Sequence, residues 1–238
     1  MEQEGLHWFV NPDVCACLYC AIPSLGLRRT MKPDYWDTAA KALAKNDPVM
    51  RRLRRLYPDI AIRRRGDAFT TLARAITGQQ ISVKAAQSVW NRVLEATGGK
   101  PGKLSAPAVI ALDPPLLRGC GLSQRKADYI RDLATKFVDG HLRPRRWRAM
   151  DDEAIIEELI TVKGIGRWTA EMFLMFNLHR PDVLPVDDLG LQNAVAKQYN
   201  DGVRLPLADI RKMGEAWAPW RSVATMYLWR SLDPIADY

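Results

Sequence analysis

The chain has 238 residues, 47% of them hydrophobic, and its formal net charge is +8 at pH 7. This length and composition allow a substantial core, in one domain or two closely packed ones, and they exclude a disordered or fibrous protein. The positive charge modestly favours a polyanionic partner, and much of it gathers at residues 51–65 and 143–148. Each of these clusters could equally be a solvated face without a partner.

The first 30 residues carry no clear targeting signal. Their longest apolar run, Val14–Ile22, is too short to span a bilayer and follows an acidic start rather than a basic one. We therefore expect no membrane anchor and a cytoplasmic protein. Three nearby cysteines could in principle bind zinc together with His7, but their spacing matches no common zinc site, so we expect no metal there; they are Cys15, Cys17 and Cys20. We interpret residues 1–30 as a disordered or extraneous extension ahead of Met31.

From Tyr35 onward, apolar residues recur at the spacing of amphipathic helices. No sustained alternation of apolar and polar residues is present, and β-branched runs are short, so the periodicity predicts an all-α fold. The expected helices cover residues 36–43, 49–56, 69–76, 83–93, 127–137, 155–160, 168–176 and 188–195. Ser82 and Ser123 are suitable N-caps for two of them.

The apolar face of residues 69–76 is followed by an interruption at Gln79 and Gln80. Two adjacent glutamines on a loop between helices have long, neutral side chains. Such side chains could enter a nucleic-acid duplex and replace an extruded base by stacking and hydrogen bonding. The alternative is a polar loop that happens to contain two glutamines.

Two helices meet at a tight turn, Val162–Gly166, in which Gly164 and Gly166 flank Ile165. Two glycines this close suggest a backbone with positive φ that a bulky group must approach, and a phosphate would be such a group. The amides of both glycines and of the next helical turn would then point outward, with Lys163 and Arg167 adding charge. The alternative is an ordinary helical corner whose glycines serve close packing.

Asp187 and Asp188 follow a proline-bearing connection and begin the next helix. A carboxylate at a helix N-terminus usually acts only as a cap. A further cluster of tryptophans lies within residues 216–230, and such a cluster is more often core than ligand platform.

Several of these motifs occur in the order of a known family. Residues 159–170, L-I-T-V-K-G-I-G-R-W-T-A, followed by V-D-D-L-G-L, resemble the helix-hairpin-helix DNA glycosylase superfamily, and within it 3-methyladenine DNA glycosylase II. The resemblance covers roughly residues 34–232, with further matching stretches at 77–86, 120–127 and 217–222.

The resemblance implies an all-α fold of two helical subdomains flanking a cleft, with a helix-hairpin-helix motif. The glycosylase domain would be residues 31–238. Its middle subdomain would cover about residues 75–185, and the N- and C-terminal helices would build the other.

The resemblance also assigns roles to individual residues. The catalytic aspartate would be Asp188, with Asp187 as the fallback. The wedge that fills the gap left by a flipped base would be Gln80, with Gln79 beside it, although the glycosylase II pattern has a leucine there. The base pocket would comprise Trp168, Trp229 and Met172. The backbone of one DNA strand would contact Lys163, Gly164, Ile165, Gly166 and Arg167. The family further implies a possible monovalent cation on the hairpin carbonyls.

The activity implied is hydrolytic removal of alkylated bases, of the 3-methyladenine and 7-methylguanine type, from double-stranded DNA during base excision repair. We expect a monomer without a cofactor, cytoplasmic, and nucleoid-associated if bacterial. One alternative is a bifunctional glycosylase that also nicks the strand, but its lysine would follow G-x-G-R, where this chain has Trp168. The C-terminal region has no cysteine for the iron-sulfur cluster of the endonuclease III branch. A non-catalytic helix-hairpin-helix DNA-binding protein is the other alternative.

Overall fold

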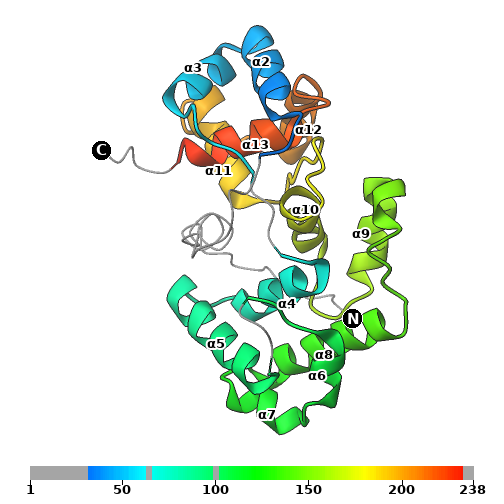
Figure 1. The fold of residues 1–238 in the computed structure, drawn as a ribbon. Coiled ribbons are helices and arrows are strands. Elements are labelled where there is room, and N and C mark those ends of the chain that lie inside the picture. The colour runs from blue at the N-terminus through cyan, green and yellow to red at the C-terminus, as the bar shows by residue number, and fades with distance from the viewer. Residues whose placement is uncertain (1–31, 63–65, 99–101, 233–238) are drawn as a thin grey trace, which may run out of the picture.

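The computed structural model describes residues 32–62, 66–98 and 102–232, so residues 1–30, interpreted as an extension, lie outside the described part. The described residues are helical with no strand, which confirms the all-α prediction (Figure 1). The helices are α2 (Trp36–Asn46), α3 (Pro48–Leu56), α4 (Ala68–Gly78), α5 (Val83–Ala96), α6 (Ala106–Ala111), α7 (Pro114–Gly119), α8 (Gln124–Val138), η1 (Trp147–Ala149), α9 (Asp152–Ile160), α10 (Arg167–Phe176), α11 (Leu189–Tyr199), α12 (Leu207–Glu215) and α13 (Arg221–Arg230).

Local capping explains where several helices begin. The side chain of Ser82 accepts a hydrogen bond from the amide of Ala85, and that of Ser123 accepts one from the amide of Lys126, so both predicted N-caps are confirmed. Asp47 caps α3 in the same way, ahead of a proline at the first helical position. These starts are specified by residues within one turn of each other, so they can be predicted without the tertiary structure.

Two groups of helices are visible in Figure 1. In one, α4, α5, α6, α7 and α8 pack together; in the other, α13 packs on α2, α3 and α11. Helix α10 lies between the groups and contacts both α4 and α9. The exact subdomain boundaries, near residues 75 and 185, stay a prediction.

A continuous hydrophobic core runs through both groups and includes several large aromatic side chains. Trp217, whose cluster favoured packing on sequence grounds, is 1% exposed and lies in this core. Within the described residues, no helix is long and apolar enough to cross a membrane.

Candidate active site

Asp188 lies at the N-terminus of α11, where it is 1% exposed. Its Oδ1 accepts a hydrogen bond from the amide of Leu191 at 2.7 Å, so this carboxylate does cap the helix. Its neighbour Asp187 is exposed. The two candidate carboxylates therefore have different environments, and only Asp188 is enclosed by the protein.

Two tryptophans from other helices also donate to the carboxylate of Asp188. The indole Nε1 of Trp229, from α13, lies 2.7 Å from Oδ1, and the indole Nε1 of Trp168, from α10, lies 2.9 Å from Oδ2. Both oxygens thus receive N–H donors, which suits an ionised carboxylate because that group can only accept hydrogen bonds. The structure brings together Trp168, Asp188 and Trp229, although Asp188 lies 20 positions after the first and 41 positions before the second.

Gly190 allows this close arrangement, and the sequence analysis missed it. A Cβ atom at this position would lie 2.9 Å from Oδ1 of Asp188 and 3.2 Å from Nε1 of Trp229. Any larger residue would therefore push the indole or the carboxylate aside. The signal in the sequence is a glycine in the first turn of a helix, where it costs stability unless close approach requires it.

The remaining pocket residues are packed rather than open. The ring of Trp229 stacks on that of Phe176, with ring centroids 6.2 Å apart and planes 9° apart, and its side chain is largely buried. Met172 is 1% exposed and belongs to the core, whereas Trp168 is only half-buried. The indoles present their N–H edges to Asp188, so the base-stacking role of Trp168, Trp229 and Met172 stays a prediction.

The two hairpin glycines differ in backbone conformation and in what lies next to them. Gly164 has φ +82°, and a Cβ there would lie 2.1 Å from Cδ2 of Tyr129 on α8. The bulky group against this glycine is therefore an aromatic ring of the protein and not a phosphate. Gly166 has φ −93° and is the N-cap of α10, so the expectation of positive φ is right for Gly164 and wrong for Gly166.

Gly166 instead faces open space, with no atom within 4 Å of a Cβ built on it. Ile165 is buried, whereas Lys163 and Gly166 are exposed. The amide of Lys163 donates to Oδ2 of Asp132 at 2.9 Å, which fixes the turn to α8. The surface of the hairpin available to a ligand is thus the Gly166 side and the Lys163 side chain.

Arg167 already has carboxylate partners. Its guanidinium donates to both oxygens of Glu153 on α9, at 2.6 and 2.7 Å, and lies 3.3 Å from Oε1 of Glu171. This ion pair joins the two helices of the hairpin. The side chain of Arg167 remains about half exposed, but its positive charge is paired with these carboxylates. The sequence pattern did not predict this pairing.

Gln79 and Gln80 are distinguished by the structure. The side-chain amide of Gln79 donates to the carbonyl of Gly164 at 2.8 Å, so this residue ties the α4–α5 loop to the hairpin. The ammonium group of Lys126 holds the same loop through the carbonyls of Thr77 and Gln79. Gln80 is exposed at the tip of the loop, with φ +57°.

Glu171 is a buried carboxyl group that the sequence analysis did not single out. It is 5% exposed, and its Oε2 has no hydrogen-bond partner within the described residues. Burial raises its pKa to about 7, with Arg167 opposing that shift and the negative charge of Asp187 adding to it. A signal was present, because a glutamate sits among the apolar residues of α10.

Glu171→Gln is expected to change how stability depends on pH. The folded-state pKa of Glu171 is about 7 and its ordinary value is 4.5, so the native state binds this proton more tightly than the unfolded state. The stability that this proton contributes is fully present below about pH 4.5 and is lost as pH rises to about 7, at a cost of about 3 kcal/mol. The variant should therefore gain in melting temperature relative to wild type between pH 5 and pH 8.

Glu153→Gln is the matched control, because Arg167 lowers the pKa of that exposed carboxyl group by hydrogen bonding. Its loss should remove a weak surface ion pair and give no gain at pH 8. Melting curves from pH 5 to pH 8 measure both variants. If the melting temperatures of wild type and Glu171→Gln changed with pH in the same way, the raised pKa of Glu171 would be contradicted.

The chain is similar in sequence to known DNA glycosylases. Over 179 residues the chain is 37% identical to DNA-3-methyladenine glycosylase 1 of Schizosaccharomyces pombe, covering 72% of this chain and 75% of that protein. It is 34% identical over 170 residues to DNA-3-methyladenine glycosylase 2 of Escherichia coli, covering 68% of this chain and 57% of the relative.

Its structure is similar to that of the Schizosaccharomyces pombe 3-methyladenine DNA glycosylase in complex with abasic DNA, with a TM-score of 0.73 and 31% identity, covering 84% of this chain and 98% of that one. Residues 73–210 match the family described as HhH-GPD superfamily base excision DNA repair protein. The match covers more than half of the chain and includes the hairpin, Trp168 and Asp188. The chain therefore belongs to the helix-hairpin-helix superfamily of base excision DNA repair proteins.

Proposed function

We propose that this protein is a monofunctional DNA glycosylase that hydrolyses the N-glycosidic bond of alkylated bases in double-stranded DNA. The substrates are of the 3-methyladenine and 7-methylguanine type: the names of its relatives print the first, and the family resemblance implies the second. One observation supports the proposal: the buried carboxylate of Asp188, the residue to which the resemblance assigns catalysis, accepts hydrogen bonds from N–H donors of three helices.

The chemistry follows from the charge of the substrate. A quaternised purine is cationic and leaves readily, so the enzyme need not protonate it. The remaining task is to stabilise an oxocarbenium-like sugar and to orient the attacking water, and one fixed carboxylate can do both. The indole donors and the helix N-terminus hold Asp188 in place, so little reorganisation is needed as positive charge develops.

A lesion must leave the base stack to reach Asp188, at a cost of a few kcal/mol. In this proposal Gln80 fills the gap that the base leaves, since it is exposed at its loop tip, and Gln79 braces the loop through Gly164. Gly166 and Lys163 contact a phosphate near the lesion, a contact that carries no sequence information. In this proposal the protein binds DNA as a monomer.

The monovalent cation implied by the family stays a prediction. Two hairpin carbonyls already have donors: Val162 accepts the amide of Ile165 at 3.1 Å, and Gly164 accepts the side chain of Gln79. A carbonyl oxygen has a second lone pair, so both could still coordinate a cation. No chemical step depends on it.

Incubation with a 7-methylguanine duplex tests the proposal. Free base should appear by chromatography while the strand stays intact until heat or alkali cleaves the abasic site. The reason is that Trp168 stands where bifunctional relatives carry the amine that forms a Schiff base.

Borohydride trapping is the complementary measurement. We expect no efficient covalent adduct between the protein and DNA. An efficient adduct would show that another amine, such as that of Lys163, forms the imine, and it would overturn the monofunctional assignment. The absence of released base from every alkylated duplex would overturn the glycosylase itself.

A further inference from the structure

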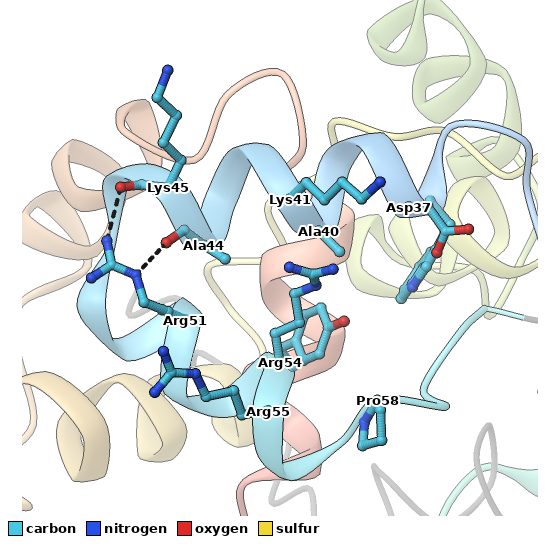
Figure 2. A pocket seen from close by; sticks show the side chains of 11 residues that line it. Asp37, Ala40, Lys41, Ala44, Lys45, Arg51, Arg54, Arg55 and Pro58 are labelled. Atoms are coloured by element: carbon cyan, nitrogen blue, oxygen red, sulfur yellow. Dashed lines mark hydrogen bonds between the residues drawn. The ribbon is translucent and has the colours of Figure 1, made fainter.

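A hollow with a volume of about 600 Å³ lies between α2 and α3, and Tyr227 of α13 borders it (Figure 2). We call it the α2–α3 groove. The small side chains of Ala40 and Ala44 on α2 leave the space for it. The complete lining is Trp36, Asp37, Ala40, Lys41, Ala44, Lys45, Arg51, Arg54, Arg55, Pro58 and Tyr227.

The groove is strongly basic. Five of its lining residues are cationic, and its one carboxylate, Asp37, lies 2.7 Å from the ammonium group of Lys32. The structural role of one cation is clear, because Arg51 donates to the carbonyls of Ala44 and Lys45 at 2.8 and 3.0 Å and so caps the end of α2. Lys45 lies in the last turn of α2, where a positive charge complements the helix dipole.

Three cations have no such structural role. Within the described residues, Lys41, Arg54 and Arg55 form no ion pair with a carboxylate. Both Lys41 and Arg54 line the groove: in Figure 2 the side chain of Arg54 extends from α3 toward α2, and that of Lys41 runs along α2. Like charges that line one groove repel one another, and an anion in the groove would reduce that repulsion.

The groove is separate from the candidate active site. Tyr227 borders it, whereas Trp229, two residues further along α13, donates to Asp188. Two residues along an α-helix are related by a rotation of about 200°, so these side chains leave α13 on opposite sides. A ligand in the groove would therefore have α13 between it and Asp188.

We propose that the α2–α3 groove binds the sugar–phosphate backbone of a second segment of duplex DNA while a first segment occupies the Asp188 site. The partner is assigned from charge complementarity: exposed lysine and arginine side chains suit a row of phosphates and read no bases. The proposal rests on the proposed function for the identity of the first ligand. Its consequence is direct transfer of the enzyme between DNA segments.

The test is competitor-driven dissociation. The full-length protein is bound to a labelled duplex and challenged with increasing amounts of unlabelled duplex at fixed ionic strength. The dissociation rate of wild type should rise with competitor concentration. In Lys41→Gln/Arg55→Gln, which changes two exposed side chains, that dependence should fall roughly tenfold, because two phosphate contacts are lost. Single-turnover base release should stay within about twofold of wild type, because the groove lies away from Asp188.

Arg211→Gln/Lys212→Gln is the matched control, since it removes the same charge from exposed positions of α12, which is drawn beside α13 in Figure 1. It should keep the wild-type dependence. Equal loss in this control would mean that only net charge matters, and the groove assignment would fail.

Three other outcomes overturn the proposal. Wild-type dissociation independent of competitor would exclude a second segment. If Lys41→Gln/Arg55→Gln lost both affinity for a short duplex and base release, the groove would be part of the first DNA-binding site. If an acidic protein raised the dissociation rate and unlabelled duplex did not, the groove would bind a different partner. Wild-type base release is scored separately, so failure of the glycosylase assignment is distinguishable from failure of the groove.

Discussion

Asp188→Asn is expected to lower single-turnover base release by about 10³-fold or more, while affinity for undamaged duplex changes by less than about twofold. The side chain keeps its shape but can no longer offset positive charge on the sugar. Release of 7-methylguanine under enzyme excess measures the first quantity, and titration of a plain duplex measures the second.

This substitution also has a structural cost that must be measured alongside. An asparagine can keep its oxygen toward Leu191 and Trp229, but its amide then meets the N–H of Trp168, so two donors face each other. An unsatisfied buried donor costs about 1–3 kcal/mol, so the melting temperature should fall. A variant that stays folded at the assay temperature and still binds plain duplex isolates the loss of charge.

Asp187→Asn provides the control because Asp187 is adjacent in sequence and exposed. It should retain most activity and nearly all stability, since surface substitutions away from special features usually change stability by less than about 0.5 kcal/mol. If the Asp187 variant were inactive and the Asp188 variant active, the catalytic assignment would be off by one residue.

The parts of the fold that could be predicted are those specified locally. The N-caps at Ser82 and Ser123 depend on residues three positions away, and the helical periodicity depends on each helix's own apolar face. The order of motifs around the hairpin and Asp188 then indicated the family. None of this required knowledge of which helices touch.

What could not be predicted depends on contacts between distant segments. Gln79 and Gln80 are identical in type, and their roles are distinguished by tertiary contacts, above all the hydrogen bond from Gln79 to Gly164, 85 residues away. The sequence likewise does not show that Gly190 must accommodate an indole from α13. Such constraints come from tertiary packing, which local patterns do not contain.

The charges of the hairpin show the same limit. Arg167 was predicted to face DNA because it follows G-x-G, yet it pairs with Glu153, 14 residues earlier, and with the buried Glu171. These carboxylates compete with a phosphate for the guanidinium, and the contact of Arg167 with the DNA backbone stays a prediction. The sequence gives the residue types but not these distances.

Gly164→Ala is expected to lower the free energy of unfolding by about 3 kcal/mol, the second large effect. Adopting the left-handed conformation costs a residue with a Cβ about 1–2 kcal/mol, and overpacking against Tyr129 adds about 1–3 kcal/mol. Urea denaturation measures the loss. In a Tyr129→Ala background the packing contribution should disappear and leave the backbone contribution, a double-mutant cycle that separates the two causes.

Gly166→Val should show the opposite pattern. Its backbone, with φ −93° and ψ 173°, is one that valine adopts readily, and the added side chain meets open space, so stability should fall by less than about 1 kcal/mol from the weaker N-cap. Affinity for any duplex, damaged or not, should nevertheless drop, because the side chain occupies the position from which the helix N-terminus would approach a phosphate. Plain-duplex titration of both variants distinguishes the two glycines. Wild-type affinity in a folded Gly166→Val protein would mean that the hairpin is a packing corner, braced by Tyr129 and Gln79, and that the phosphate contact must be sought elsewhere.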